Sequence, residues 1–120
     1  MADQDTPSRE IPKRVVSVDR DGVRLAGVSD SVADGRKVVA SAGTRVQFDP
    51  LVCRTASITA ELGNTGVIVV GGPTVVAASG TRSGTPLSAG DTAIAAVSNM
   101  NLLYMDATVS GEGVTFTVLA

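Results

Sequence analysis

Apolar and polar residues alternate along much of the chain, and this alternation predicts short β-strands separated by turns. Over residues 52–62 the even-numbered positions are apolar, except for Arg54, and the odd-numbered positions are mostly polar. A period of two is that of a strand with one buried and one exposed face. Arg54 breaks the alternation, which places it at a strand end. Residues 114–120 repeat the pattern, and we expect Thr115 and Thr117 to face outward.

One predicted strand lacks this alternation. Residues Val67 to Val70 form a continuous apolar run, which predicts a strand buried on both faces. We expect further strands at 37–40, 44–48, 74–78, 92–97 and 101–107, and loops at 29–36 and 79–91. Roughly seven to nine short strands with Gly, Pro and Asn turns are typical of a sandwich or barrel. We therefore predict one all-β domain over residues 14–120, an antiparallel β-sandwich.

The first part of the chain differs in character. Residues 1–13 are polar, contain Pro7 and Pro12, and show no periodicity. They predict either a flexible or partner-ordered arm or a terminus without a role. Residues 14–28 predict a β-hairpin that turns at residues 19–22. The candidate docking residues of the arm are Arg9, Ile11, Lys13 and Arg14.

The block from Leu62 to Gly90 contains a single charged side chain, Arg82. A solvated surface normally carries more charge, so the block is interior, packed against other subunits, or both. We interpret it as the contact region of a homo-oligomer. The candidate interface residues are Val67, Val69, Val75, Val76, Arg82 and Ala95. Arg82 has two interpretations, a contact with a carboxylate of a partner or a solvated loop tip.

Composition supports a β domain and narrows the range of partners. Val occurs 19 times and Thr 12 times, and branched side chains suit a pleated sheet. The only aromatic residues are Phe48, Tyr104 and Phe116, so the core is thin, and oligomerisation is one way to bury more surface. A net charge of −2 argues against a nucleic-acid partner. The start has no signal-peptide core and no apolar run reaches the ~20 residues of a membrane span, so we expect synthesis in a cytoplasm and no membrane partner.

The chain offers little for catalysis. It has no His, the commonest general base and metal ligand. Its one cysteine, Cys53, has no His partner and is interpreted as a small packed residue. The carboxylates of Asp91, Asp106 and Glu112 can form a pair only if their loops converge. We predict that the protein is not an enzyme.

Two local motifs suggest ligands and are better explained as turns. Asp19, Asp21 and Gly22 resemble the start of a calcium loop, but the further oxygen ligands are absent. The glycine-rich loops at 63–66 and 80–84 lack the G-K-[ST] ending of a phosphate loop. We therefore expect no metal site and no cofactor.

Five segments, taken in order, resemble a family of small virion proteins from tailed phages and related archaeal viruses. They are G-T-R-V-Q-F at 43–48, G-N-T-G-V-I-V-V-G-G at 63–72, L-S-A-G-D-T at 87–92, N-L-L-Y-M-D-A at 101–107 and G-E-G-V-T-F at 111–116. The resemblance covers residues 41–120, about two thirds of the chain. It implies a β-sandwich or jelly-roll protein on a capsid or tail, usually a homo-oligomer that needs no cofactor.

The residue pattern and the resemblance together predict a jelly-roll-like β-sandwich that acts as a structural virion protein, made in the host cytoplasm. The first expectation is a capsid decoration or turret protein, bound as a homo-oligomer to the major capsid protein or another virion protein. A tail-associated structural protein is the nearest variant. The alternative from another class is a glycan-binding module for host-surface adhesion, with Tyr104 as its aromatic candidate.

Overall fold

The computed structural model describes residues 28–120. The predicted arm at 1–13, with its docking residues Arg9, Ile11, Lys13 and Arg14, lies outside the described residues, and so does the predicted hairpin up to residue 27. The described residues form eight strands and one short 3₁₀ helix, η1 (Met100–Leu102).

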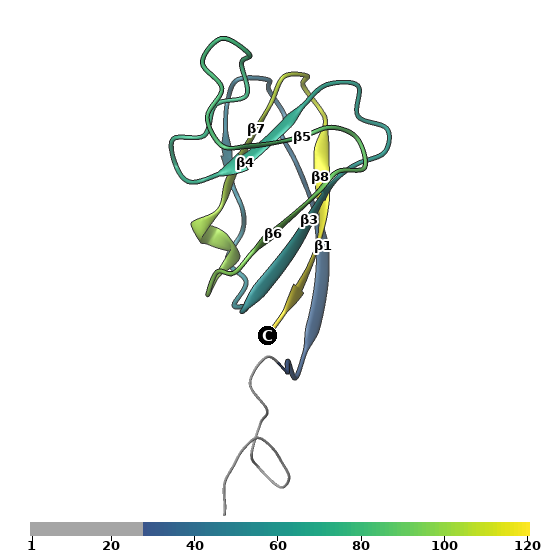
Figure 1. Ribbon diagram of the computed structural model, residues 1–120, viewed down its shortest axis with the longest axis vertical. Coiled ribbons are helices and arrows are strands. Elements are labelled where there is room, and N and C mark those ends of the chain that lie inside the picture. Colours follow the sequence, from purple (N-terminus) through teal and green to yellow (C-terminus); the bar gives the residue numbers. More distant parts are fainter. Residues whose placement is uncertain (1–27) are drawn as a thin grey trace, which may run out of the picture.

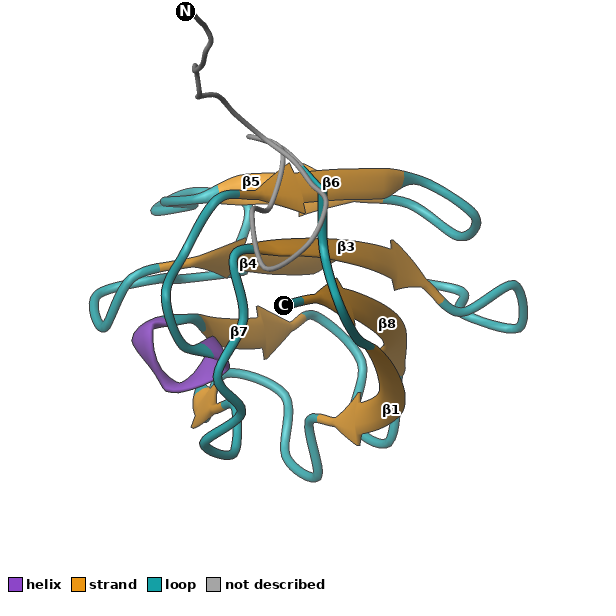
Figure 2. Ribbon diagram, turned by 90° about the horizontal axis from the view of Figure 1, so that it is seen from below, coloured by secondary structure: helices purple, strands orange, loops and turns teal. Residues whose placement is uncertain are grey.

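The strands form two antiparallel sheets of four strands each (Figure 1). Sheet A contains, in spatial order, β1 (Val32–Val38), β8 (Gly113–Leu119), β3 (Thr55–Ala60) and β6 (Thr92–Ala95). Sheet B contains β2 (Val46–Gln47), β7 (Tyr104–Ala107), β4 (Ile68–Gly71) and β5 (Thr85–Leu87). Figure 2 shows β5, β4 and β7 facing β6, β3 and β8 across the molecule.

One core lies between the two sheets. Ile58 and Val114 of sheet A belong to the same buried cluster as Ile68 and Met105 of sheet B. At one side of this core the rings of Phe48 and Phe116 meet edge to face, with centroids 5.8 Å apart. The all-β prediction is therefore confirmed, and the two sheets enclose a common core as in a β-sandwich.

The predicted alternation in β3 and β8 is confirmed. In β3, Ala56, Ile58 and Ala60 are fully buried, whereas the side chains between them lie half-buried on the other face. In β8, Thr115 and Thr117 are exposed as expected. Arg54 comes directly before β3, at the strand end predicted for it.

Strand β4 is buried on both faces, as its apolar run predicts. Ile68 and Val70 join the core between the sheets. Val69 points to the outer side of sheet B, where it forms a second buried cluster with Val75 and Ala77. The chain segment after β4 supplies this outer cover.

The predicted loop at 29–36 is wrong, because β1 occupies residues 32–38. The polar residues of this segment lie on the outer side of sheet A, and the backbone is held by antiparallel pairing with β8 over seven residues. Gly35 is opposite Phe116, and a Cβ atom at this position would run into the phenyl ring. This glycine therefore makes room for a ring rather than for a turn.

Other expected boundaries also differ. The predicted strand at 44–48 shortens to β2, and the segment 74–78 holds only an isolated bridge between Val76 and Ser83. The predicted loop at 79–91 contains β5. Pro86 argues against a strand in the sequence, but proline is tolerated in β5 because β5 is an edge strand. The expected strand at 101–107 is divided into η1 and β7.

Candidate functional site

The outer side of sheet A presents a set of hydroxyl and apolar side chains that faces away from the core. We call this set the outer face. Its members are Val32, Asp34, Arg36, Thr55, Ser57, Thr59, Thr92, Ile94, Thr115, Thr117 and Leu119. They lie on one side because alternate residues of a strand point the same way and the pairing of neighbouring strands keeps them in rows.

The centre of the outer face consists of short hydroxyl side chains in register. One row runs across three strands through Thr115, Thr59 and Thr92. The hydroxyls of Thr59 and Thr92 are 2.7 Å apart and form a hydrogen bond. The next row carries Thr117 and Ser57. Branched and hydroxyl side chains suit strands, so the residues that build the sheet also give it a short, even surface.

Apolar side chains flank these hydroxyls. Val32 and Ile94 are each 68% exposed, and Leu119 is 39% exposed. Val32 and Leu119 are cross-strand partners, so their side chains lie next to each other. Ile94 is the partner of Ser57 on the opposite edge of the sheet. Their exposure is consistent with a surface that another molecule covers.

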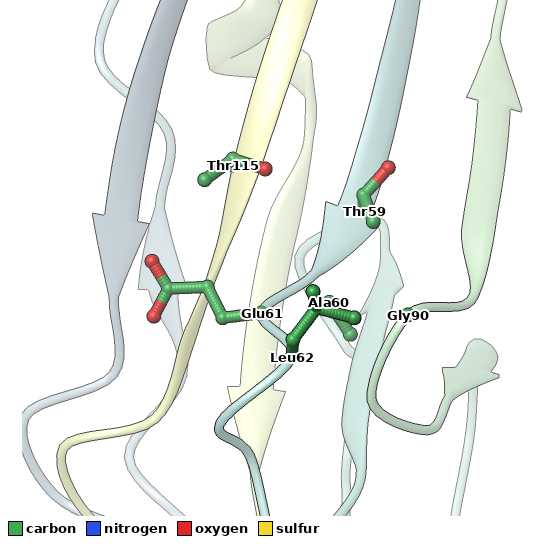
Figure 3. Close-up of a pocket in the computed structure, with 6 residues that line it drawn as sticks. All are labelled: Thr59, Ala60, Glu61, Leu62, Gly90 and Thr115. Atoms are coloured by element: carbon green, nitrogen blue, oxygen red, sulfur yellow. The ribbon is translucent and has the colours of Figure 1, made fainter.

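A cavity of about 450 Å³ lies at the Gly90 end of the outer face (Figure 3). Thr59 and Thr115 contribute to it from neighbouring strands, and Leu62 and Gly90 contribute from the segments next to β3 and β6. Leu62 is 85% exposed, the most solvent-accessible large apolar side chain among the described residues. The cavity therefore has a lining of apolar and hydroxyl residues together with the acidic residue Glu61.

The charges of the outer face lie at its β1 side. Arg36 forms an ion pair with Glu61, and its Nη2 donates to Glu61 Oε1 over 3.0 Å. The hydrogen bond to Glu61 and the attraction of that carboxylate raise the pKa of the Arg36 guanidinium, so Arg36 stays charged. Within residues 28–120 Asp34 has no ion-pair partner. The centre of the outer face thus carries no charged side chain, and its charged residues lie along its β1 edge.

This arrangement suits a flat protein partner better than a small ligand. Four strands about 4.8 Å apart and seven residues of about 3.3 Å each give a face of roughly 400 Å². A standard interface covers about 800 Å² on each partner. The outer face alone therefore has about half the area of a standard interface.

The six residues predicted as an interface do not form one surface. Val69 and Val75 are covered by their own chain, so the shielding of these two side chains is intramolecular. Val67 packs partly against them, and Ala95 packs against the core from sheet A. Val76 is half-buried, and Arg82 is exposed, with its Nε donating to the carbonyl oxygen of Ala77 over 3.0 Å.

The cover over Val69 is held by Asp106, a buried carboxylate that sequence reasoning left without a role. Asp106 Oδ2 accepts from the N–H of Ala77, and Oδ1 accepts from the N–H groups of Gly43 and Ala107, at 2.8–3.1 Å. Because these backbone donors satisfy it, the carboxylate is tolerated at 2% exposure. Beside it, Ala42, Gly43, Ala78 and Thr108 help to line a second cavity of about 390 Å³.

Glu112 fastens the turn before β4 in a similar way. Its Oε2 accepts from the N–H and the hydroxyl of Thr65, at 2.6 and 2.8 Å, and its Oε1 accepts from the N–H of Gly66 at 2.9 Å. The hydrogen bond from the Thr65 backbone, aided by those from Gly66 and the Thr65 hydroxyl, lowers the pKa of Glu112 against the opposing effect of burial. Asp106 and Glu112 are thus separate backbone clamps, each with its own donors. Asp91 accepts from the N–H of Ser88 at 3.0 Å.

Cys53 is buried at 4% exposure, and its Sγ lies 3.1 Å from the carbonyl oxygen of Val97. Burial raises the pKa of this thiol, which disfavours the thiolate. The structure thus places Cys53 as a packed residue. Over residues 28–120 there is no group of three His, Cys, Asp or Glu side chains placed to hold a metal ion.

Tyr104 lies half-buried against the second cluster, next to Val69 and Val75. Part of its ring is therefore used for packing. No helix among the described residues has the length and apolar character needed to cross a membrane.

Comparison of the chain with protein-family models, with curated proteins and with solved structures gives no match.

Proposed function

We propose that this chain is a structural virion protein with a jelly-roll fold, and that it assembles as a homo-oligomer on the capsid as a decoration or turret protein. Its partners in this proposal are further copies of itself and the major capsid protein or another virion protein. The observation that carries the proposal is the order of the strands in the two sheets, combined with an outer face that stays exposed among residues 28–120.

The strand order supports the jelly-roll assignment. Sheet A is ordered β1-β8-β3-β6 and sheet B β2-β7-β4-β5. The neighbours β1 and β8, β2 and β7, β3 and β6, and β4 and β5 pair the first strand with the last and continue inward. A long two-stranded ribbon folded over two sheets has this pairing, which is that of an eight-stranded jelly roll.

The fold narrows the range of functions without choosing among them. Jelly rolls occur in viral capsid proteins, in lectins and in cupins, so function has to be argued from the site. The centre of the site consists of uncharged hydroxyl and apolar side chains, which suits contact with another protein. The resemblance of residues 41–120 to small virion proteins favours a place on a virion, on its capsid or its tail.

The self-association part of the proposal is tested in solution. Sedimentation velocity of the purified chain should give a multimer, and Ile94→Lys should weaken it because the lysine charge is placed in the neutral face. The matched control is Leu102→Lys, since Leu102 is 54% exposed in η1, outside sheet A. An unchanged multimer for Ile94→Lys would remove the outer face from the interface.

The virion part is tested on the native particle. A reconstruction should show copies of this domain on the outside of the head. Density on the tail would support the tail-associated variant instead, and a particle without the protein would overturn the virion role.

The strand order also supports a second candidate, a glycan-binding module, because lectins share the jelly roll. Sugar recognition usually relies on an exposed aromatic ring, and Tyr104 offers only part of its ring. A glycan array tests this candidate. Binding that Tyr104→Ala abolishes, while the fold is retained, would favour it over the structural role.

A further inference from the structure

Within residues 28–120, strand β1 is an edge strand of sheet A, and we call the side of β1 that faces away from β8 its free edge. Ser31 and Ala120 exchange both backbone hydrogen bonds, at 3.0 Å each, and the N–H of Val39 donates to the carbonyl oxygen of Glu112. Because antiparallel pairs alternate, the odd-numbered residues of β1 bond to β8. The N–H and C=O groups of Val32, Asp34, Arg36 and Val38 therefore point to the free edge, where no other strand of residues 28–120 pairs with them.

The edge strands at the other three sheet edges are shorter than β1. Strand β2 has two residues, and β5 has three, of which Pro86 has no N–H to donate. Strand β6 has four residues. Only β1, with seven residues, is long enough to accept a full added strand. Unpaired edges of this length are sites at which another chain adds a strand.

The upstream chain leaves the domain on the other side of β8. The carbonyl oxygen of Val28 accepts from Arg54 Nη1 over 2.7 Å, and Arg54 directly precedes β3. The N–H groups of Asp30 and Ser31 both donate to the carbonyl oxygen of Ala120, at the end of β8. The chain thus crosses the end of sheet A from β3 to β1. Val28 is therefore tied to sheet A beside the guanidinium of Arg54.

We propose that the free edge of β1 is filled by residues 14–18 of a second copy, so that neighbouring subunits exchange strands. This segment reads R-V-V-S-V, which is rich in β-branched residues. Nine residues lie between Val18 and Val28, and the ten steps from one to the other span up to about 33 Å when extended. Arg14 brings a cation to an edge that exposes the carboxylate of Asp34.

The strand exchange adds interface area to that of the outer face. That face covers roughly half of a standard interface, and an added strand contributes backbone hydrogen bonds and further buried surface. A closed ring of copies leaves no β1 edge unfilled. The inference rests on the self-association in the proposed function, but not on the virion role.

Cross-linking tests the exchange in the full chain. Two chains of different mass carry Cys53→Ala, so that each has a single new thiol, Val16→Cys in one and Asp34→Cys in the other. A short thiol cross-linker should join the unlike chains. Leu102→Cys, in η1 and outside sheet A, replaces Asp34→Cys in the control and should give roughly tenfold less product or lower, because docking raises the local concentration of the paired thiols.

A second arm measures assembly of the full chain. Val16→Pro should weaken self-association roughly tenfold or more, because proline interrupts strand pairing, whereas Thr6→Pro should leave it unchanged. A link that forms only within one chain carrying both cysteines would overturn the exchange in favour of a folded-back segment. If Val16→Pro leaves the multimer intact and no cross-link forms between unlike chains, the exchange is overturned. The outer face then remains as the interface.

The remaining outcomes separate the two proposals. A chain that stays monomeric at every concentration would overturn both the exchange and the self-association. A link between copies, combined with a native particle that lacks the protein, would support the exchange and overturn only the virion role.

Discussion

The carboxylate of Asp106 accepts a hydrogen bond from the backbone N–H of Ala77, 2.9 Å away, and so ties β7 to the segment that follows β4. That segment lies over Val69 and buries it from the outer side of sheet B. A charge held by backbone donors thus secures an apolar cover over Val69, whereas 18 of the 29 residues in the block from Leu62 to Gly90 are exposed.

Replacing the carboxylate should loosen this cover. Asp106→Asn keeps the size of the side chain but turns an acceptor oxygen into an NH₂ group that faces backbone donors. We expect a loss of about 1–3 kcal/mol in the free energy of unfolding, measured by urea denaturation. Asp34→Asn, on the exposed face of β1, is the control and should stay within about 0.5 kcal/mol of wild type. Equal effects for the two variants would show that the Asp106 hydrogen bonds contribute nothing specific.

A substitution at Val69 tests whether the segment after β4 buries this side chain. Val69→Asp places a charge without a partner at a fully buried position. We expect it to cost at least about 3 kcal/mol, or to prevent folding, as seen by far-UV circular dichroism and denaturation. Val52→Asp is the matched control, because Val52 is 71% exposed. A soluble, fully stable Val69→Asp protein would contradict the second cluster.

Gly113 tests a close approach between strands. It pairs with Val38, and a Cβ atom there would run into the carbonyl oxygen of Lys37 and the backbone of Val38. Gly113→Ala should therefore destabilise the protein by about 2–3 kcal/mol, since the backbone cannot give way cheaply. Thermal unfolding measures both this variant and its control, Gly63→Ala. Gly63→Ala has open space around its new methyl group and should leave the stability nearly unchanged.

Glu112 should make stability depend on pH. Its pKa is lowered in the folded protein, so its contribution is present above the unfolded value of about 4.3 and is lost as the pH falls through the lower folded value. The melting temperature of wild type should exceed that of Glu112→Gln at neutral pH, and the difference should shrink on acidification. A constant difference down to strongly acidic pH would show that the carboxylate charge is not responsible.

The alternation of residues was enough to predict the strongest strands. Ala56, Ile58 and Ala60 alternate with hydroxyl residues, and the period of two decides which side chains are buried wherever one face meets a core. The same alternation placed Thr115 and Thr117 on an exposed side. What remained hidden was that these hydroxyls meet those of a neighbouring strand, because strand order is not written in local sequence.

Segments with weak local signals depended on long-range pairing. The segment around Asp34 and Gly35 has the composition of a turn, yet β8 makes it a strand because backbone hydrogen bonds outweigh local preference at a sheet edge. Pro86 likewise concealed β5. The backbone clamps of Asp106 and Glu112 also could not be foreseen, since their donors lie at least 29 residues away, apart from Ala107.

The sequence by itself determined that this protein is built of strands, and which side chains of β3, β4 and β8 are removed from water, because those properties follow from local periodicity and side-chain shape. Only the tertiary structure decided how the strands are ordered, that the chain covers Val69 itself, and that sheet A presents an outer face with an uncharged centre and, among residues 28–120, an unpaired β1 edge. Those features arise from contacts between residues far apart in the chain, where packing and backbone hydrogen bonding select one arrangement among many that share the same local pattern.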